Sequence, residues 1–109
     1  MSNPIITVEE LHEMLATGKA VTMLDIRPKA QREEWQIAGS QFVDAYNHLR
    51  EGDYSALDAI DIPEGTLAVT ICGAGGLSLI AAAALIKRGV HALSLEGGMK
   101  AWESKFGRN

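Results

Sequence analysis

One segment combines a reactive side chain with a flexible backbone. Cys72 follows an apolar, β-branched stretch at residues 67–71 and precedes Gly73, Gly75 and Gly76. A strand that leads through a glycine-rich loop into a helix places the intervening thiol at the carboxyl end of a sheet, where open α/β folds bind ligands. The glycines let successive N–H groups turn inward as an anion-binding nest, and the helix adds the positive end of its dipole. We therefore expect N–H donors, rather than a neighbouring base, to hold Cys72 as a thiolate or persulfide.

Two simpler interpretations of this loop involve no chemistry. Free cysteine is among the most buried residue types and can act as a small hydrophobe, and glycines can form a plain tight turn. A nucleotide-phosphate loop is a third alternative, but the Gly-Lys-Ser/Thr of a P-loop is missing. A cysteine that only packs does not need glycines on its carboxyl side, so the glycines favour a reactive residue.

The surrounding sequence predicts alternating strands and helices. Strands are expected at residues 20–26, 42–43, 67–71 and 91–95, and helices at 8–16, 29–36, 78–88 and 99–106, with one or two short helices within 45–64. Thr7 and Glu10 have the spacing of a capping box, Gly89 suits a helix end, and Gly97-Gly98 suits a turn. Because parallel strands need crossover connections, this alternation predicts an α/β fold with a parallel sheet covered by helices on both faces.

Size and composition limit the classes of protein to consider. The 109 residues, 47% hydrophobic and 22% charged, predict one globular domain over residues 1–109. A net charge of -4 with scattered Lys and Arg disfavours nucleic acid as a partner, and no apolar run is long enough to cross a membrane.

Cysteine and histidine usage narrows the chemistry further. Cys72 is the only cysteine, which excludes an internal disulfide or a resolving thiol in the same chain. The N-terminus lacks the pattern of a secretory signal, so we expect a cytoplasmic protein. One cysteine and three scattered histidines do not have metal-ligand spacing, and neither a metal nor a cofactor is expected.

Three motifs, taken in order, resemble the single-domain rhodanese-like sulfurtransferase family. They are Leu24-Asp25-Ile26-Arg27, then Cys72-Gly73-Ala74-Gly75-Gly76-Leu77-Ser78, and then Leu95-Glu96-Gly97-Gly98-Met99-Lys100-Ala101-Trp102. The resemblance implies a single rhodanese-like domain with a five-stranded parallel sheet. It also implies that Cys72 is catalytic, accepting a sulfane sulfur from a donor and passing it to a nucleophilic acceptor without a cofactor. The loop residues would bind the transferred sulfur through their N–H groups: Gly73, Ala74, Gly75, Gly76, Leu77 and Ser78.

The sequence departs from this family pattern at two loop positions. Many single-domain members carry arginines at the second and sixth positions of the loop, which here are Gly73 and Leu77. Binding of a doubly charged donor such as thiosulfate should then depend on backbone N–H groups and be weaker. Related phosphatases have a loop one residue longer that ends in arginine, where this chain has Ser78, so phosphatase chemistry is disfavoured.

Several side chains near the motifs have a structural and a functional interpretation. For the Ser78 hydroxyl we favour a helix cap over donation to the sulfur. The resemblance implies that Asp25 and Arg27 form a structural pair rather than ligands of the substrate. His48 and Arg50 could supply the charge that the loop lacks, although a solvated surface is favoured.

Two functions from different classes follow. The first is a sulfurtransferase that moves sulfur from thiosulfate, a persulfide or mercaptopyruvate through a Cys72 persulfide to a thiol, a cyanide-like acceptor or a protein. The second is a sulfur carrier or protein-interaction module with little turnover, which the missing loop arginines favour. Phe42, Tyr46 and Tyr54 are a candidate docking patch for a protein partner, and Trp102 and Phe106 are expected to pack the terminal helix on the core.

Overall fold

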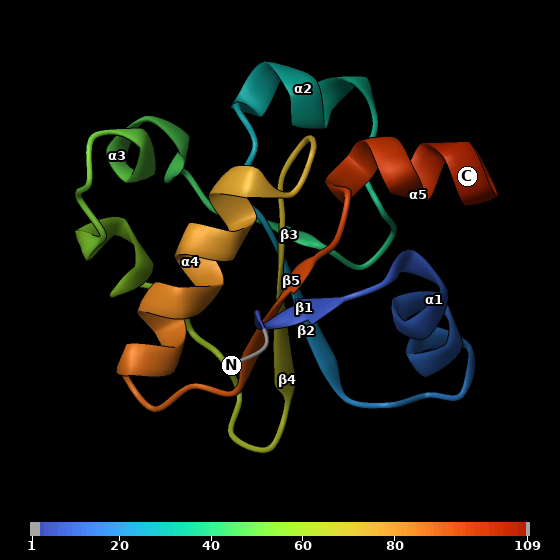
Figure 1. Cartoon of the computed structure of the whole chain (residues 1–109), viewed down its shortest axis with the longest axis horizontal. Coiled ribbons are helices and arrows are strands. Elements are labelled where there is room, and N and C mark those ends of the chain that lie inside the picture. Colours follow the sequence, from blue (N-terminus) through green and yellow to red (C-terminus); the bar gives the residue numbers. More distant parts are fainter. Residues whose placement is uncertain (1–2, 109) are drawn as a thin grey trace.

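Five parallel strands form one sheet in the order β1-β5-β4-β2-β3 (Figure 1). The structure is a computed structural model that describes residues 3–108. The strands are β1 (Ile5–Ile6), β2 (Val21–Asp25), β3 (Gln41–Phe42), β4 (Leu67–Ile71) and β5 (Ala92–Leu95). Every neighbouring pair is parallel, with β4 in the centre between β5 and β2. The predicted α/β fold with a five-stranded parallel sheet is confirmed.

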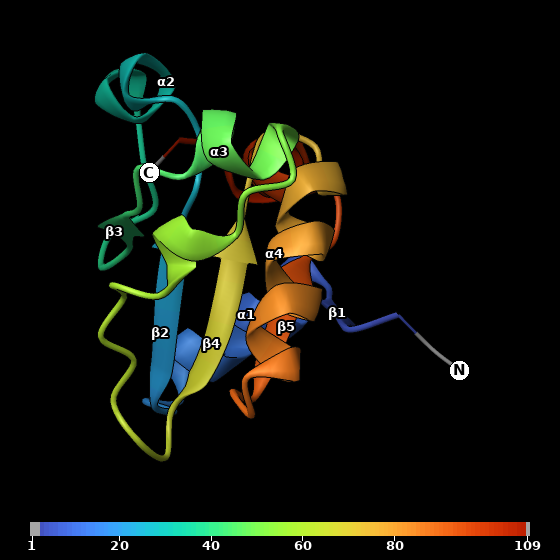
Figure 2. The same cartoon turned by 90° about the vertical axis from the view of Figure 1, so that its left-hand side faces the viewer.

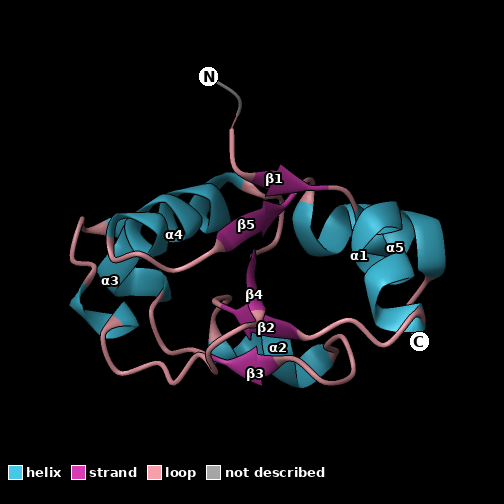
Figure 3. Cartoon of the chain, turned by 90° about the horizontal axis from the view of Figure 1, so that it is seen from below, coloured by secondary structure: helices cyan, strands magenta, loops and turns pink. Residues whose placement is uncertain are grey.

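Helices cover both faces of this sheet, as predicted. Figure 3 shows α1 (Val8–Ala16) and α5 (Gly98–Phe106) on one side, with α3 (Tyr46–Arg50) and α4 (Gly76–Lys87) on the other. The short α2 (Lys29–Glu34) lies between β2 and β3 along the chain, and a 3-10 helix (Ser55–Leu57) follows α3. The longest helix, α4, has 12 residues, and none in residues 3–108 combines the length and apolar character needed to span a bilayer.

The central strand β4 is apolar at four of its five positions, the exception being Thr70. Ala68 belongs to the hydrophobic cluster under α3 and α4, whereas Val69 and Ile71 belong to the cluster under α1 and α5. Successive side chains of a strand point to opposite faces, so a strand covered on both faces is mainly apolar. The hydroxyl of Thr70 is buried but donates to the Ser78 carbonyl at 2.6 Å. Trp102 is buried in the second cluster and Phe106 packs against it, which confirms their predicted role.

The capping box predicted for α1 is present. The N–H of Glu10 donates to Thr7 Oγ1 at 3.1 Å, and the N–H of Thr7 donates to Glu10 Oε1 at 2.9 Å. By contrast, α4 begins at Gly76, two residues earlier than predicted, and no side chain caps it. Its N-cap is Gly75, whose φ of 99° lies in the left-handed region that favours glycine.

The first strand, β1, was not predicted from residue patterns. It consists of two residues, which is too short to show a period. Its place is fixed by β5, since the N–H of Ser94 donates to the Pro4 carbonyl at 2.7 Å and the N–H of Glu96 to the Ile6 carbonyl at 2.8 Å. This strand is recognised only through its pairing.

The carboxyl ends of the parallel strands meet at one edge of the sheet. Figure 2 shows that α2, α3 and the first turn of α4 gather at this edge, above the tip of β4. Cys72 follows Ile71, the last residue of β4. The fold therefore places the cysteine loop where α/β sheets commonly bind ligands.

Candidate active site

The sulfur of Cys72 accepts hydrogen bonds from the loop that follows it. The N–H of Gly75 lies 3.1 Å from Sγ and the N–H of Ser78 lies 3.4 Å from it. Cys72 is buried, with 4% of its surface exposed, and it belongs to the cluster under α4. Backbone N–H groups that converge on one atom stabilise negative charge there. The geometry therefore suits a sulfur anion, although the atom is less accessible than a surface thiol.

The first turn of α4 holds further donors beside the sulfur. The first N–H groups of a helix have no acceptor within it, and those of Gly76 and Leu77 have no backbone acceptor in the described part of the chain. Ala74 and Gly76 are exposed, while Gly73, Gly75 and Leu77 are half-buried. The outer side of the loop thus presents unused donors to solvent.

Ser78 does not cap α4, so that prediction was wrong. It is the third residue of the helix, and its fully buried hydroxyl lies 3.3 Å from Cys72 Sγ and 2.7 Å from the hydroxyl of Ser94. The helix starts too early for Ser78 to stand at its N-cap. Its hydroxyl contacts the sulfur, which was the less favoured alternative.

The first turn of α5 holds the opposite side of the cysteine loop. The carbonyls of Cys72 and Gly73 accept hydrogen bonds from the N–H groups of Met99 and Lys100, at 2.9 and 3.0 Å. This close contact requires Gly98, because a Cβ there would lie 2.8 Å from the Gly73 carbonyl and closer still to the Cys72 oxygen. The sequence indicated only a turn at Gly97-Gly98, whereas the structure shows a docking contact.

Asp25 and Arg27 form a buried ion pair at the end of β2. Arg27 Nη2 lies 2.8 Å from Asp25 Oδ2, and its Nε lies 3.0 Å from Oδ1. Arg32 contacts the same carboxylate at 3.1 Å, and Arg27 also donates to the Trp35 carbonyl. Both arginines are engaged by Asp25, so the interpretation of a structural pair fits the geometry.

The two candidate cations on α3 have partners away from the loop. His48 Nδ1 lies 3.4 Å from the Asp53 carboxylate, and both side chains are about half exposed. The Arg50 guanidinium lies 5.7 Å from the ring centre of Tyr46. Neither has a hydrogen bond or an ion pair with the cysteine loop among residues 3–108, in line with a solvated surface.

Lys100 is a cation near the loop that sequence reasoning missed. Its backbone N–H binds the Gly73 carbonyl, and its side chain lines a hollow of about 330 Å³ together with Gly73, Trp35 and Arg108. The sequence alone does not indicate that a single lysine on the last helix lies beside the cysteine loop. It becomes noticeable only when α5 is seen to dock on the loop.

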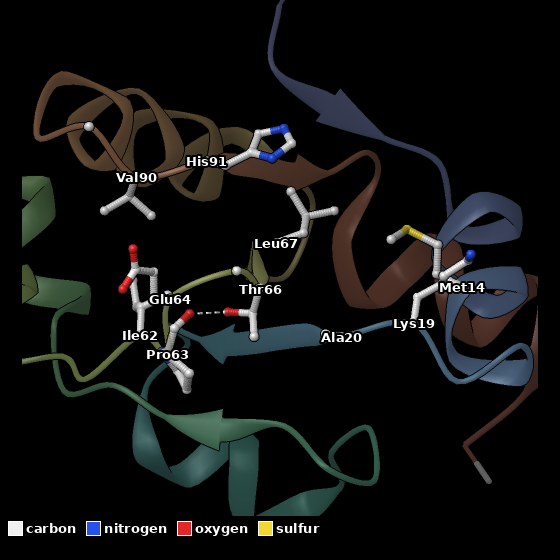
Figure 4. A pocket seen from close by; sticks show the side chains of 12 residues that line it. Met14, Lys19, Ala20, Ile62, Pro63, Glu64, Thr66, Leu67, Val90 and His91 are labelled. Carbon is white, nitrogen blue, oxygen red and sulfur yellow. Dashed lines mark hydrogen bonds between the residues drawn. The ribbon is translucent and has the colours of Figure 1, made fainter.

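Another hollow lies at the opposite edge of the sheet, where the strands begin. It measures about 630 Å³ and is lined by residues that precede β2, β4 and β5, among them Lys19, Glu64 and His91 (Figure 4). These three side chains come from different sides of the hollow. Within residues 3–108, no three His, Cys, Asp or Glu side chains gather as metal ligands. The carboxyl edge at Cys72 therefore remains the better candidate site.

Comparisons with known proteins agree with this fold. A rhodanese-related protein from Thermoplasma volcanium is 24% identical with a TM-score of 0.75, over 94% of this chain and 92% of its own. A rhodanese homologue from Thermus thermophilus is 29% identical with a TM-score of 0.62, over 88% and 97%. A human single-domain sulfurtransferase is 22% identical with a TM-score of 0.72, over 95% and 98%.

A family model also matches most of this chain. No curated protein sequence matches this chain. The model of the rhodanese-like domain matches residues 7–105, which include the strand, loop and helix around Cys72 and the first turn of α5. This chain belongs to the rhodanese-like domain family.

Proposed function

We propose that this protein is a sulfurtransferase that carries the transferred sulfur as a persulfide on Cys72. The observation that carries the proposal is the sulfur atom of Cys72, which accepts two backbone N–H groups at the uncapped start of α4. Membership of the rhodanese-like family supports the same reaction class. Gly73, Ala74, Gly75, Gly76, Leu77 and Ser78 are the proposed binding residues.

The proposed reaction has two stages and needs no cofactor. In the first, the Cys72 thiolate attacks the outer sulfur of a donor such as thiosulfate. A new S–S bond forms, the donor's S–S bond breaks, and sulfite leaves with the electron pair. In the second, a thiol or cyanide attacks the terminal sulfur of the persulfide, and Cys72 leaves as a thiolate. Negative charge is present at every stage, so the same fixed N–H donors stabilise each one.

The donors of this loop are neutral groups, which bears on donor choice. The loop from Gly73 to Ser78 contains no lysine or arginine, and Lys100, which lines the hollow beside Gly73, is a candidate partner for an approaching anion. Binding of a dianion such as thiosulfate should therefore be weak. A lone thiol with this role also needs a reducing compartment, and we propose a cytoplasmic location.

Intact-mass measurement tests the proposal directly. The protein is incubated separately with thiosulfate, mercaptopyruvate and glutathione persulfide, and a gain of one sulfur atom with at least one donor is expected. The Cys72→Ser variant is the matched control, since Cys72 is the only cysteine. Equal loading of Cys72→Ser, or no loading of the natural chain with any donor, would refute the assignment.

A second candidate function is a carrier or interaction module with little turnover. It is favoured by the low exposure of Cys72 and by the absence of loop cations. Tyr54 is 41% exposed, while Phe42 and Tyr46 are half-buried, so a docking patch here would centre on Tyr54. Steady-state assays with cyanide or a thiol acceptor separate the two functions, because a carrier loads sulfur without rapid turnover and a pure interaction module does not load it.

A further inference from the structure

A second serine stands behind the one that touches the sulfur. Ser78 Oγ lies 3.3 Å from Cys72 Sγ and 2.7 Å from Ser94 Oγ. Ser94 is on β5, and both serines are fully buried. The three atoms therefore form a chain that leads from the sulfur into the sheet, closed to solvent at its inner end.

The direction of these two hydrogen bonds depends on whether the sulfur carries a proton. A hydroxyl donates one hydrogen bond and accepts up to two. When Cys72 is a thiol, its S–H can donate to Ser78, and Ser78 to Ser94. When Cys72 has lost its proton to solvent, the sulfur can only accept. Ser78 must then donate to the sulfur, and its oxygen is free to accept from Ser94. Ionisation of the sulfur therefore fixes both directions, with Ser94 donating to Ser78 and Ser78 donating to the sulfur.

We propose that Ser94 is a positioning residue for Cys72, because its hydroxyl donates to Ser78 and so keeps the Ser78 hydroxyl aimed at the sulfur anion. The proposal rests on the proposed role of Cys72 as the ionised sulfur carrier. Consecutive hydrogen bonds polarise one another. Ser94 therefore strengthens the hydrogen bond from the Ser78 hydroxyl to the sulfur without contacting the sulfur itself. It acts on the thiolate, and on a persulfide sulfur that still accepts from Ser78.

Thr70 supplies an internal control for this inference. Its hydroxyl is also fully buried, but it donates to the backbone carbonyl of Ser78 at 2.6 Å. It therefore helps to hold α4 on β4 without joining the chain that ends at the sulfur. Thr70→Val removes a buried hydroxyl from the same region and keeps the shape of the side chain.

The rate of Cys72 alkylation by iodoacetamide, measured against pH, tests the proposal. The single cysteine makes this readout specific, and it does not depend on sulfur transfer. We expect the midpoint to move upward by about half a pH unit in Ser94→Ala and about one unit in Ser78→Ala. Thr70→Val should keep the natural midpoint. A natural midpoint in Ser94→Ala would overturn the proposal.

Other charged groups around the carboxyl edge are the same residues in all of these variants. They lie on the elements packed around the loop: Asp25, Arg27, Arg32, His48, Arg50, Glu96 and Lys100. A difference between variants therefore reports the hydroxyl that was removed.

A double variant distinguishes positioning from a general structural role. If Ser94 acts through Ser78, adding Ser94→Ala to Ser78→Ala should move the midpoint no further. Independent, additive shifts would overturn the proposal, since they would mean that Ser94 affects the sulfur by another route.

A measurement on the natural protein covers the case in which Ser94→Ala does not fold. The Cβ chemical shifts of Ser78 and Ser94 should titrate with the same midpoint as Cys72, while that of Thr70 should remain constant. A Ser94 Cβ chemical shift that stays constant with pH would refute the proposed role of Ser94. Absence of sulfur loading alongside these titrations would instead refute the proposed function, so the two failures are distinguishable.

Discussion

The first turns of α1 and α4 each have N–H groups without an acceptor inside the helix, and these N–H groups find different partners in the two helices. In α1, Thr7 and Glu10 cap each other's N–H groups with their own side chains. In α4, the N-cap is a glycine, and the N–H groups of Gly75 and Ser78 point at the sulfur of Cys72. A capped helix start gains local stability. An uncapped one keeps donors for a group that can change its charge or bind a ligand.

The strongest test of this contrast concerns the contact that holds the loop against α5. Gly98→Ala should lower the free energy of unfolding by about 3 kcal/mol, because Cβ meets loop backbone and φ is +57°. Sulfur loading of Cys72 should fall sharply as the loop moves. Denaturant unfolding and intact mass measure the two effects.

Gly18→Ala is the matched control for that substitution. Gly18 also has a positive φ, +74°, but nothing lies within 4 Å of its Cβ position. It should lose only about 1 kcal/mol, with normal loading. An equal loss of unfolding free energy in Gly98→Ala and Gly18→Ala would contradict this prediction. It would mean that the cost comes from backbone strain alone and not from the contact between α5 and the loop.

Gly75→Ala sharpens the comparison at the start of α4 itself. A Cβ there would lie 3.0 Å from the Gly97 nitrogen at a φ of +99°. We expect a loss of about 2 kcal/mol and a higher midpoint for Cys72 alkylation, since the Gly75 N–H is displaced from the sulfur. Gly89→Ala, at the other end of α4, has a φ of +86° with open space around it. Gly89→Ala should lower the free energy of unfolding without moving the midpoint of Cys72 alkylation. The same midpoint shift in Gly75→Ala and Gly89→Ala would contradict this prediction.

The capped helix should respond in stability alone. Thr7→Ala removes the N-cap hydroxyl of α1 and should lower the free energy of unfolding by about 1 kcal/mol. Sulfur loading and the alkylation midpoint of Cys72 should stay unchanged, because α1 contributes no donor to the loop. A fall in loading of the folded variant would show that the two helix starts are coupled.

The smallest expected effect is a pH dependence confined to α1. The backbone N–H of Thr7, followed by its hydroxyl, holds the pKa of the Glu10 carboxyl below its usual value. A lowered pKa in the folded state stabilises the protein above the unfolded pKa, and this contribution is lost as pH falls through the folded pKa. The stability difference between the natural chain and Glu10→Gln should therefore shrink on acidification. Urea unfolding at neutral and acidic pH measures it, and a constant difference would contradict the capping contribution.

The central part of the fold could be predicted from patterns of residues close in sequence. The apolar run before Cys72, the glycines after it and the pair Thr7 and Glu10 each involve residues close in sequence, so their consequences follow from backbone geometry. These features predicted β4, the cysteine loop and the start of α1. The parallel sheet followed from the alternation of strands and helices.

Contacts between distant segments escaped prediction. The strand at Ile5–Ile6 exists only because β5 pairs with it. Ser94 looks like any small residue of a buried strand until α4 places Ser78 2.7 Å away. The function of Gly98 depends on a loop that precedes it by more than twenty residues. Ser78 was misjudged because the helix boundary, which a glycine N-cap hides, decided what its hydroxyl could reach.

The main chain of the cysteine loop contacts two neighbours, with the N–H groups of Gly75 and Ser78 directed at the sulfur and the carbonyls of Cys72 and Gly73 directed at α5. Apart from the Ser78 hydroxyl, the groups that contact the sulfur from this loop therefore belong to the main chain. The side chain of Ala74 is exposed, so this position can change without loss of packing. Evolution could retune which molecules dock at this rim while leaving the charge-stabilising apparatus intact.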